Sequence, residues 1–185
     1  MLEAFAISTL TVAVAEMGDK TQLLAIILAA RFRQPWAVIA GIFTATILNH
    51  ALAAMLGALI ARMVPDGWLH YLLAAGFFAT AIWALVPDKP DDGPVGVGKW
   101  GAFLATTIAF FVVEMGDKTQ IATVALAARF DSVVAVTMGT TAGMMLANAP
   151  AVIFADKLLR VLPMKLLRFV AAAIFAALGV GALLA

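Results

Sequence analysis

The chain has 185 residues, of which 64% are hydrophobic and only 12% are charged, and its net charge is +1. Soluble domains typically carry about 25% charged residues, so this composition excludes an ordinary soluble domain, and the near-zero net charge gives no sign of nucleic-acid binding. The absence of cysteine excludes disulfides and thiolate metal sites. The sequence therefore predicts an integral membrane protein with almost no mass outside the bilayer.

Six apolar segments are each long enough to cross a bilayer, which takes about 20 helical residues. In chain order they are 3–30, 36–61, 68–86, 100–128, 133–156 and 165–184. No cleavable signal peptide is expected, because Glu3 stands where a basic region would be, and the first segment is predicted to be a retained span. The predicted fold class is an all-α integral membrane protein with six transmembrane helices.

The two halves of the chain are repeats at an offset of 98 residues. The segment from Glu16 to Gln22 reads EMGDKTQ and recurs letter for letter from Glu114 to Gln120. We predict a first three-helix repeat at 1–87, a cytoplasmic linker at 88–98, which is rich in Pro, Gly and Asp, and a second repeat at 99–185. Because each half has an odd number of spans, the repeats should be inverted relative to each other in the membrane.

The positive charges of the connections predict the orientation. The connections after the first, third and fifth spans hold eight Lys and Arg residues, and the opposite side holds Arg62 and Arg129. Positive loops favour the cytoplasm, so both termini are predicted to lie outside it.

Each motif places three charged side chains inside an apolar span. A charge at the centre of a membrane helix costs about 2.5–3.5 kcal/mol, so these groups should pair, hold protons or surround an ion in a protein-lined cavity. On a continuous helix Glu16, Asp19 and Lys20 would share one face. If the two motif helices cross, four acids converge as metal ligands: Glu16, Asp19, Glu114 and Asp117.

Carboxylates and neutral oxygens, without cysteine or a nearby histidine, suit hard divalent cations such as Ca²⁺, Mg²⁺ and Mn²⁺. Four acids and two lysines sum to a charge of −2, which one divalent cation or two protons would neutralise. Close carboxylates also share protons. The pattern therefore predicts exchange of metal for protons, with the metal as transported substrate and no cofactor.

A second group of polar and backbone positions is predicted to support the site. Gly18 and Gly116 either permit a helix break that exposes carbonyls or serve helix packing. Pro150 is expected to bend its helix and free the carbonyl near Leu146. His50 either relays protons or bonds between helices. The other residues predicted to line the ion pathway are Lys20, Thr21, Gln22, Lys118, Thr119, Gln120, Asn49 and Asn148.

Two E-x-G-D-K-T motifs, each on the first span of a three-span repeat, resemble those of the uncharacterised protein family 0016. That family includes Golgi manganese and calcium transporters, chloroplast relatives and bacterial manganese exporters. The resemblance covers nearly the whole chain, and it implies a cation/proton antiporter that exports Mn²⁺, and in some members Ca²⁺, through the motif acids. The short linker and the lack of an N-terminal extension imply a minimal bacterial member in the inner membrane. The oligomeric state stays open, with a homodimer as one alternative.

Other functions compete with metal export. An exporter of cationic organic solutes, such as basic amino acids, would usually have aromatic side chains at its site, whereas the motif neighbours here are small and aliphatic apart from Phe110 and Phe111. A membrane aspartyl protease of the G-x-G-D type needs glycine where Glu16 and Glu114 stand, so we expect no enzyme. A purely structural subunit would have no use for six buried charges.

Overall fold

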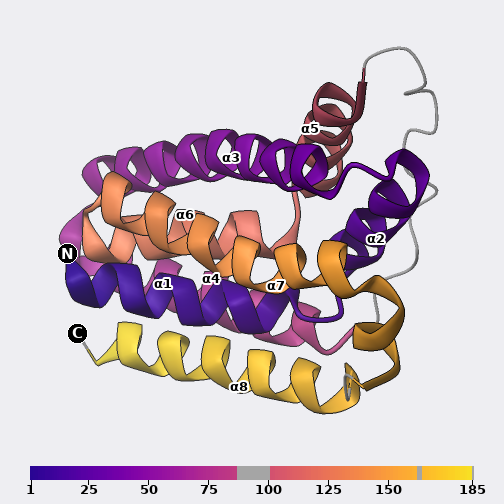
Figure 1. Ribbon diagram of the computed structural model, residues 1–185. Helices are drawn as coiled ribbons and strands as arrows, with labels where there is room; N and C mark the ends of the chain where they lie inside the picture. Colours follow the sequence, from indigo (N-terminus) through magenta and orange to yellow (C-terminus); the bar gives the residue numbers. More distant parts are fainter. Residues whose placement is uncertain (87–100, 162–163, 185) are drawn as a thin grey trace.

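The computed structural model describes residues 1–86, 101–161 and 164–184 (Figure 1). All regular structure in these ranges is α-helical, which confirms the predicted all-α class. The helices are α1 (Leu2–Glu16), α2 (Lys20–Phe32), α3 (Pro35–Met63), α4 (Asp66–Ala84), α5 (Gly101–Glu114), α6 (Lys118–Phe130), α7 (Val133–Val161) and α8 (Met164–Leu183). The predicted linker at 88–98 lies outside the described residues.

Four of these helices contain stretches long and apolar enough to cross a membrane. The stretches are Pro35–Met63, Gly67–Ala84, Val133–Phe154 and Lys165–Leu183, and α5 is a shorter apolar helix. The chain is therefore a multi-pass membrane protein.

The prediction of continuous helices over 3–30 and 100–128 is wrong, because each segment is broken at its motif. The first helix ends at Glu16, and the next begins at Lys20. Between them Gly18 has φ 81°, and its counterpart Gly116 has φ 80°, in the left-handed region that side chains other than hydrogen disfavour. Glu16 and Asp19 therefore do not share a helical face. They lie on the two sides of a break, as the alternative reading of the glycines proposed.

The helices of the second half repeat those of the first at the offset of 98 residues. The bounds of α2 and α6 correspond, as do those of α3 and α7. The packing repeats as well, since α1 packs along α7 and α5 along α3. Figure 1 shows both chain termini at the same end of the molecule.

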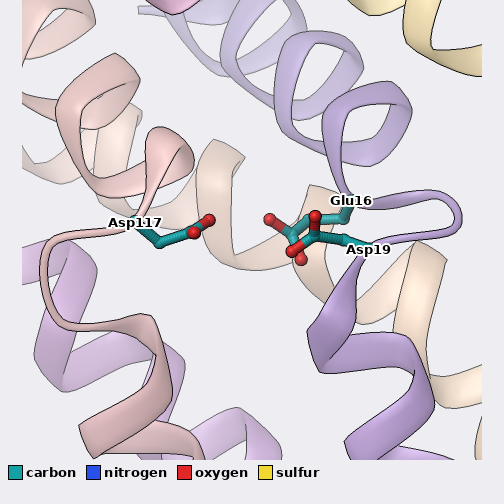
Figure 2. Close-up of side chains that lie close together, drawn as sticks. All are labelled: Glu16, Asp19 and Asp117. Atoms are coloured by element: carbon teal, nitrogen blue, oxygen red, sulfur yellow. The ribbon is translucent and has the colours of Figure 1, made fainter. Parts of the chain in front are cut away.

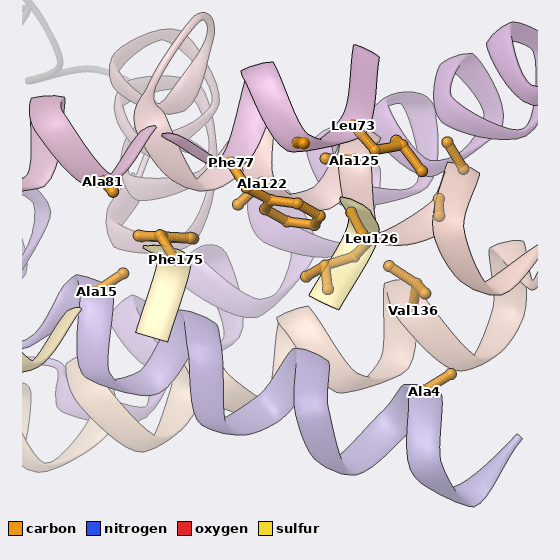
Figure 3. Packing of buried hydrophobic residues seen from close by; sticks show 14 of the residues in the cluster. Ala4, Ala15, Leu73, Phe77, Ala81, Ala122, Ala125, Leu126, Val136 and Phe175 are labelled. Carbon is orange, nitrogen blue, oxygen red and sulfur yellow. The ribbon is translucent and has the colours of Figure 1, made fainter. Parts of the chain in front are cut away.

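Small residues allow the helices to approach closely. A Cβ added at Gly57 of α3 would lie 2.1 Å from the carbonyl oxygen of Val124 in α6, and one at Gly139 of α7 would lie 2.5 Å from that of Phe5 in α1. Such contacts are typical of membrane helices, whose association depends on close packing. A buried cluster that includes Phe77, Leu126 and Phe175 joins α4, α6 and α8 (Figure 3).

Helix α7 contains Pro150, and its backbone departs from helical geometry at Phe154, with φ −117° and ψ 27°. The irregularity therefore lies one turn after the proline, whereas the expected bend placed the freed carbonyl before it, near Leu146. The carbonyl that receives a side chain from the motif is the neighbouring one, of Ala147.

Candidate cation site

Each broken helix is held in shape by side chains of its own motif. The backbone N–H of Gly18 donates to Oε1 of Gln22 at 3.0 Å, and that of Gly116 donates to Oε1 of Gln120 at 2.7 Å. A glutamine in the first turn of a helix that returns to an N–H before it resembles half of a capping box. The two glutamines, predicted to line the ion pathway, thus stabilise the breaks in this structure.

The hydroxyl groups of the motifs bond the glutamates. Thr21 donates to Oε2 of Glu16 at 2.6 Å, and Thr119 donates to Oε2 of Glu114 at 3.3 Å. Both glutamates are fully buried, and the second carboxylate oxygen of each, Oε1, has no hydrogen-bond partner within the described residues. Since buried polar atoms are normally satisfied, these oxygens are candidates for bonds to a cation or a proton.

Each motif lysine pairs with the aspartate of the other motif. Nζ of Lys20 lies 3.2 Å from Oδ1 of Asp117, and Lys118 pairs with Oδ1 of Asp19. The lysine side chains differ in exposure, at 20% for Lys20 and 5% for Lys118. The lysines therefore act as internal counter-ions inside the protein rather than reaching to a membrane surface.

Three of the four predicted acids bring oxygen atoms together. One carboxylate oxygen each of Glu16, Asp19 and Asp117 lies within 4.8 Å of the others, and Figure 2 shows Asp117 facing the other two from the opposite side. Oxygens on opposite sides of a Ca²⁺-sized ion bound at about 2.3–2.6 Å are about 4.6–5.2 Å apart, so the cluster has the dimensions of a cation site. Glu114 lies outside this cluster, but it is buried within electrostatic range of its three acids.

The helix ends add to the preference for a cation. Helices α1 and α5 end at Glu16 and Glu114, so the negative ends of two helix dipoles point into the region of the acids. Broken helices in transporters use such ends and the unwound carbonyls to hold cations.

The polar residues predicted on the second and fifth spans are all buried. The amide of Asn49 donates to the carbonyl of Phe111 in α5 at 3.0 Å, while that of Asn148 donates to the carbonyl of Met144 at 3.1 Å. His50 is fully buried, and neither ring nitrogen has a hydrogen-bond partner in the described part of the chain. The expected bond between helices is therefore made by Asn49 and not by His50.

A small cavity of about 10 Å³, room for about one water molecule, adjoins the site. Its lining includes Asp19, Lys118 and, from α8, Arg168. Arg168 is one of the eight Lys and Arg residues that predict the orientation, and its place beside the acids was not predicted from the sequence. Nothing local in the sequence reports that the start of α8 packs beside the break of α1.

Comparison with known proteins identifies the family. The sequence pattern of the family described as divalent cation/proton antiporter GDT1 matches residues 4–92 and 102–185. The chain belongs to this family. This result confirms the resemblance drawn from the duplicated motifs. The GDT1 family is one of transporters, so the chain is not an enzyme, and the divalent cation and the proton are its substrates.

Relatives support the membership in the GDT1 family. A Vibrio cholerae protein named as a candidate manganese exporter is 47% identical over 176 residues, which cover 95% of this chain and 88% of that protein. A GDT1-like protein of Synechocystis is 33% identical over 152 residues, or 69% of this chain and 71% of the relative. No solved structure matches the chain.

Proposed function

We propose that the chain exports a divalent cation from the cytoplasm, Mn²⁺ in the first place and Ca²⁺ as a second substrate, in exchange for protons. The observation that carries the proposal is the cluster of Glu16, Asp19 and Asp117, three buried carboxylates brought together by two broken helices. The name of the Vibrio cholerae relative supports Mn²⁺ as the metal.

The charges at the site account for the coupling. With all groups ionised, the four motif acids and two lysines carry −2, so the site is neutral with one divalent cation or with two protons. An empty and deprotonated site is costly in a low-dielectric interior, so the empty protein does not readily change conformation. The metal enters from the cytoplasm, displaces protons from the acids, and leaves on the other side when protons return.

The proposed topology has six spans. We place α1 with α2 in the first span and α5 with α6 in the fourth, because each pair is one apolar segment interrupted at its motif. The two halves are then inverted repeats, with the acids near the midplane at their interface. The bias of positive charge to the linker side supports a topology with both termini outside the cytoplasm of a bacterial inner membrane. Each chain carries both motifs and so a whole site, and transport does not require a homodimer.

The alternative, export of cationic organic solutes, has little support from the geometry. The cavity beside the acids holds about one water, and the lysines already occupy the volume that an organic ammonium group would take. A bare metal ion fits this space.

Proteoliposomes with a proton-sensitive dye inside test the proposal. Addition of Mn²⁺ or Ca²⁺ should move protons, and Asp117→Asn should abolish the signal. Glu3→Gln is the matched control, because it neutralises an exposed acid far along α1 from the break. A metal-dependent proton flux that survives in Asp117→Asn would contradict the assigned ligands, and its absence in the folded wild type would contradict the exchange.

A further inference from the structure

We propose that the exposed face of α2 formed by Ile27, Ala30 and Arg31 is a second docking surface for the α4–α8 helix pair, occupied in the opposite state of the transport cycle. The inference rests on the proposed exchange function, because only a transporter needs two states. Its starting point is a difference between two halves that are otherwise repeats.

The packing of α4 and α8 does not follow the internal symmetry. Helices α4 and α8 pack along each other, α4 also packs on α6, and α8 also packs on α1. The repeat relates α6 to α2 and α1 to α5, but within the described residues neither α8 with α2 nor α4 with α5 forms a comparable interface. The rest of the bundle is more symmetric, since α1 with α7 and α5 with α3 both pack closely.

Burial of equivalent positions shows the same difference. Ala125 of α6 is 7% exposed, whereas its repeat mate Ile27 of α2 is 57% exposed. Likewise Ala128 is buried, and its mate Ala30 is exposed. Ile27 and Ala30 of α2 are therefore exposed, whereas the equivalent residues of α6 are buried in the cluster that α6 forms with α4 and α8.

A specific polar contact marks the covered face. Nη1 of Arg129, near the end of α6, donates to the carbonyl of Leu178 in α8 at 3.2 Å, and its guanidinium lies against Gly181. The repeat mates of these residues are Arg31, Thr80 and Trp83. The guanidinium carbon of Arg31 lies 5.8 Å from the centroid of the Phe32 ring, and that of Arg129 lies 5.6 Å from the centroid of the Phe130 ring. The two arginine side chains therefore extend from their helices in the same direction relative to the following ring.

Exchange of the two repeats' roles then specifies the second state. The α4–α8 pair leaves α6 and α1 and docks on α2 and α5, with Arg31 donating to the carbonyl of Thr80 and stacking on Trp83. Figure 1 shows that α6 ends at the end of the molecule with the chain termini and that α2 ends at the opposite end. In the second state the pair packs on α2 instead of α6, and we expect this move to change the end of the molecule from which the acids are reached.

Cysteine cross-links test this arrangement, because the chain has no native cysteine. Leu73 of α4 and Ala125 of α6 belong to the same packed cluster (Figure 3), so Leu73→Cys with Ala125→Cys reports the present state. At the offset of 98 residues, Leu73 corresponds to Ala171 and Ala125 to Ile27. The pair Ala171→Cys with Ile27→Cys should therefore cross-link only in the second state. Each pair should form a disulfide under mild oxidant in membranes, and each disulfide should stop transport until it is reduced.

The arginines provide the matched variants. Arg31→Ala should lower the ratio of the second cross-link to the first by about tenfold, the effect of one lost charge-assisted hydrogen bond, and Arg129→Ala should raise it to a similar degree. Arg62→Ala is the control, since Arg62 is an exposed arginine in the last turn of α3 and lies outside the proposed contact.

The outcomes separate this inference from the proposed function. If the chain exchanges Mn²⁺ for protons but Ile27→Cys with Ala171→Cys never cross-links, at any pH or Mn²⁺ concentration, the docking surface is wrong and the exchange stands. If both cross-links form in a protein that moves no metal, the two states stand and the proposed function is wrong.

Discussion

Lys20 of the first motif lies 3.2 Å from Asp117 of the second, so one half of the chain neutralises an acid that the other half supplies. Lys118 and Asp19 form the reciprocal pair. The acids are therefore held in place by the same contacts that join the repeats, and the state of the site and the packing of the two halves are linked.

Loss of Lys118, the more buried motif lysine, should lower the stability of the protein more than loss of Lys20. Lys118→Met removes the counter-ion of a buried aspartate and should destabilise the protein by about 3–5 kcal/mol, the usual cost of breaking a buried pair. Lys20→Met should cost less, because that side chain is 20% exposed against 5%. Thermal unfolding of both variants in detergent measures the difference. Equal losses would contradict the asymmetry of the two pairs.

Gly116→Ala should strain the second helix break. The position has φ 80° and no atom within 4 Å of an added Cβ, so the cost is purely that of the backbone and should be about 1–2 kcal/mol. Gly76→Ala is the control, because it has equally open surroundings but lies inside α4, where alanine is favoured by about 1 kcal/mol. The unfolding temperature should fall for Gly116→Ala and rise slightly for Gly76→Ala, and Mn²⁺ uptake should fall only for Gly116→Ala. A neutral Gly116→Ala would argue against a rigid break.

The two motif glutamines should not be equivalent. Gln22 bonds the N–H of Gly18 and also donates from Nε2 to the carbonyl of Ala147 in α7 at 3.0 Å. Gln22→Leu therefore removes a contact between helices as well as the local bond, at about 1–3 kcal/mol for a buried group left unsatisfied. Gln120→Leu serves as the comparison, since its bond to Gly116 is local. Stability measured by denaturation should fall further for Gln22→Leu, and the reverse order would contradict the contact with α7.

Acidification on the metal-binding side should weaken Mn²⁺ binding. Protons compete for the same carboxylates, so if two leave with each metal, the apparent Kd should rise about 100-fold per pH unit at acidic pH. Asp117→Asn removes one of these acids, so the apparent Kd of any residual Mn²⁺ binding should increase by only about tenfold for each pH unit of acidification. Calorimetry of Mn²⁺ binding across pH, with Glu3→Gln as control, gives the slope. A Kd that does not change with pH would remove proton competition from the mechanism.

Much of this organisation was predictable from the duplicated motif. Its charges inside apolar segments required partners, and its glycines allowed a helix break. The break itself was not decided, because a glycine between two acids suits either a left-handed turn or close helix packing. Identical motifs also gave no reason to expect that Glu114 lies outside the cluster formed by Glu16, Asp19 and Asp117. Such differences depend on how the helices of the two halves pack together, which the local sequence does not encode.

The crossed lysines bear on how such a protein can be divided. Each of the two motif ion pairs takes its cation from one repeat and its anion from the other. A half-length chain would carry every residue type of the site, yet it would neutralise its aspartate only against a second copy inserted in the opposite direction. Two separately encoded halves would therefore recognise each other through the very groups that carry the ion.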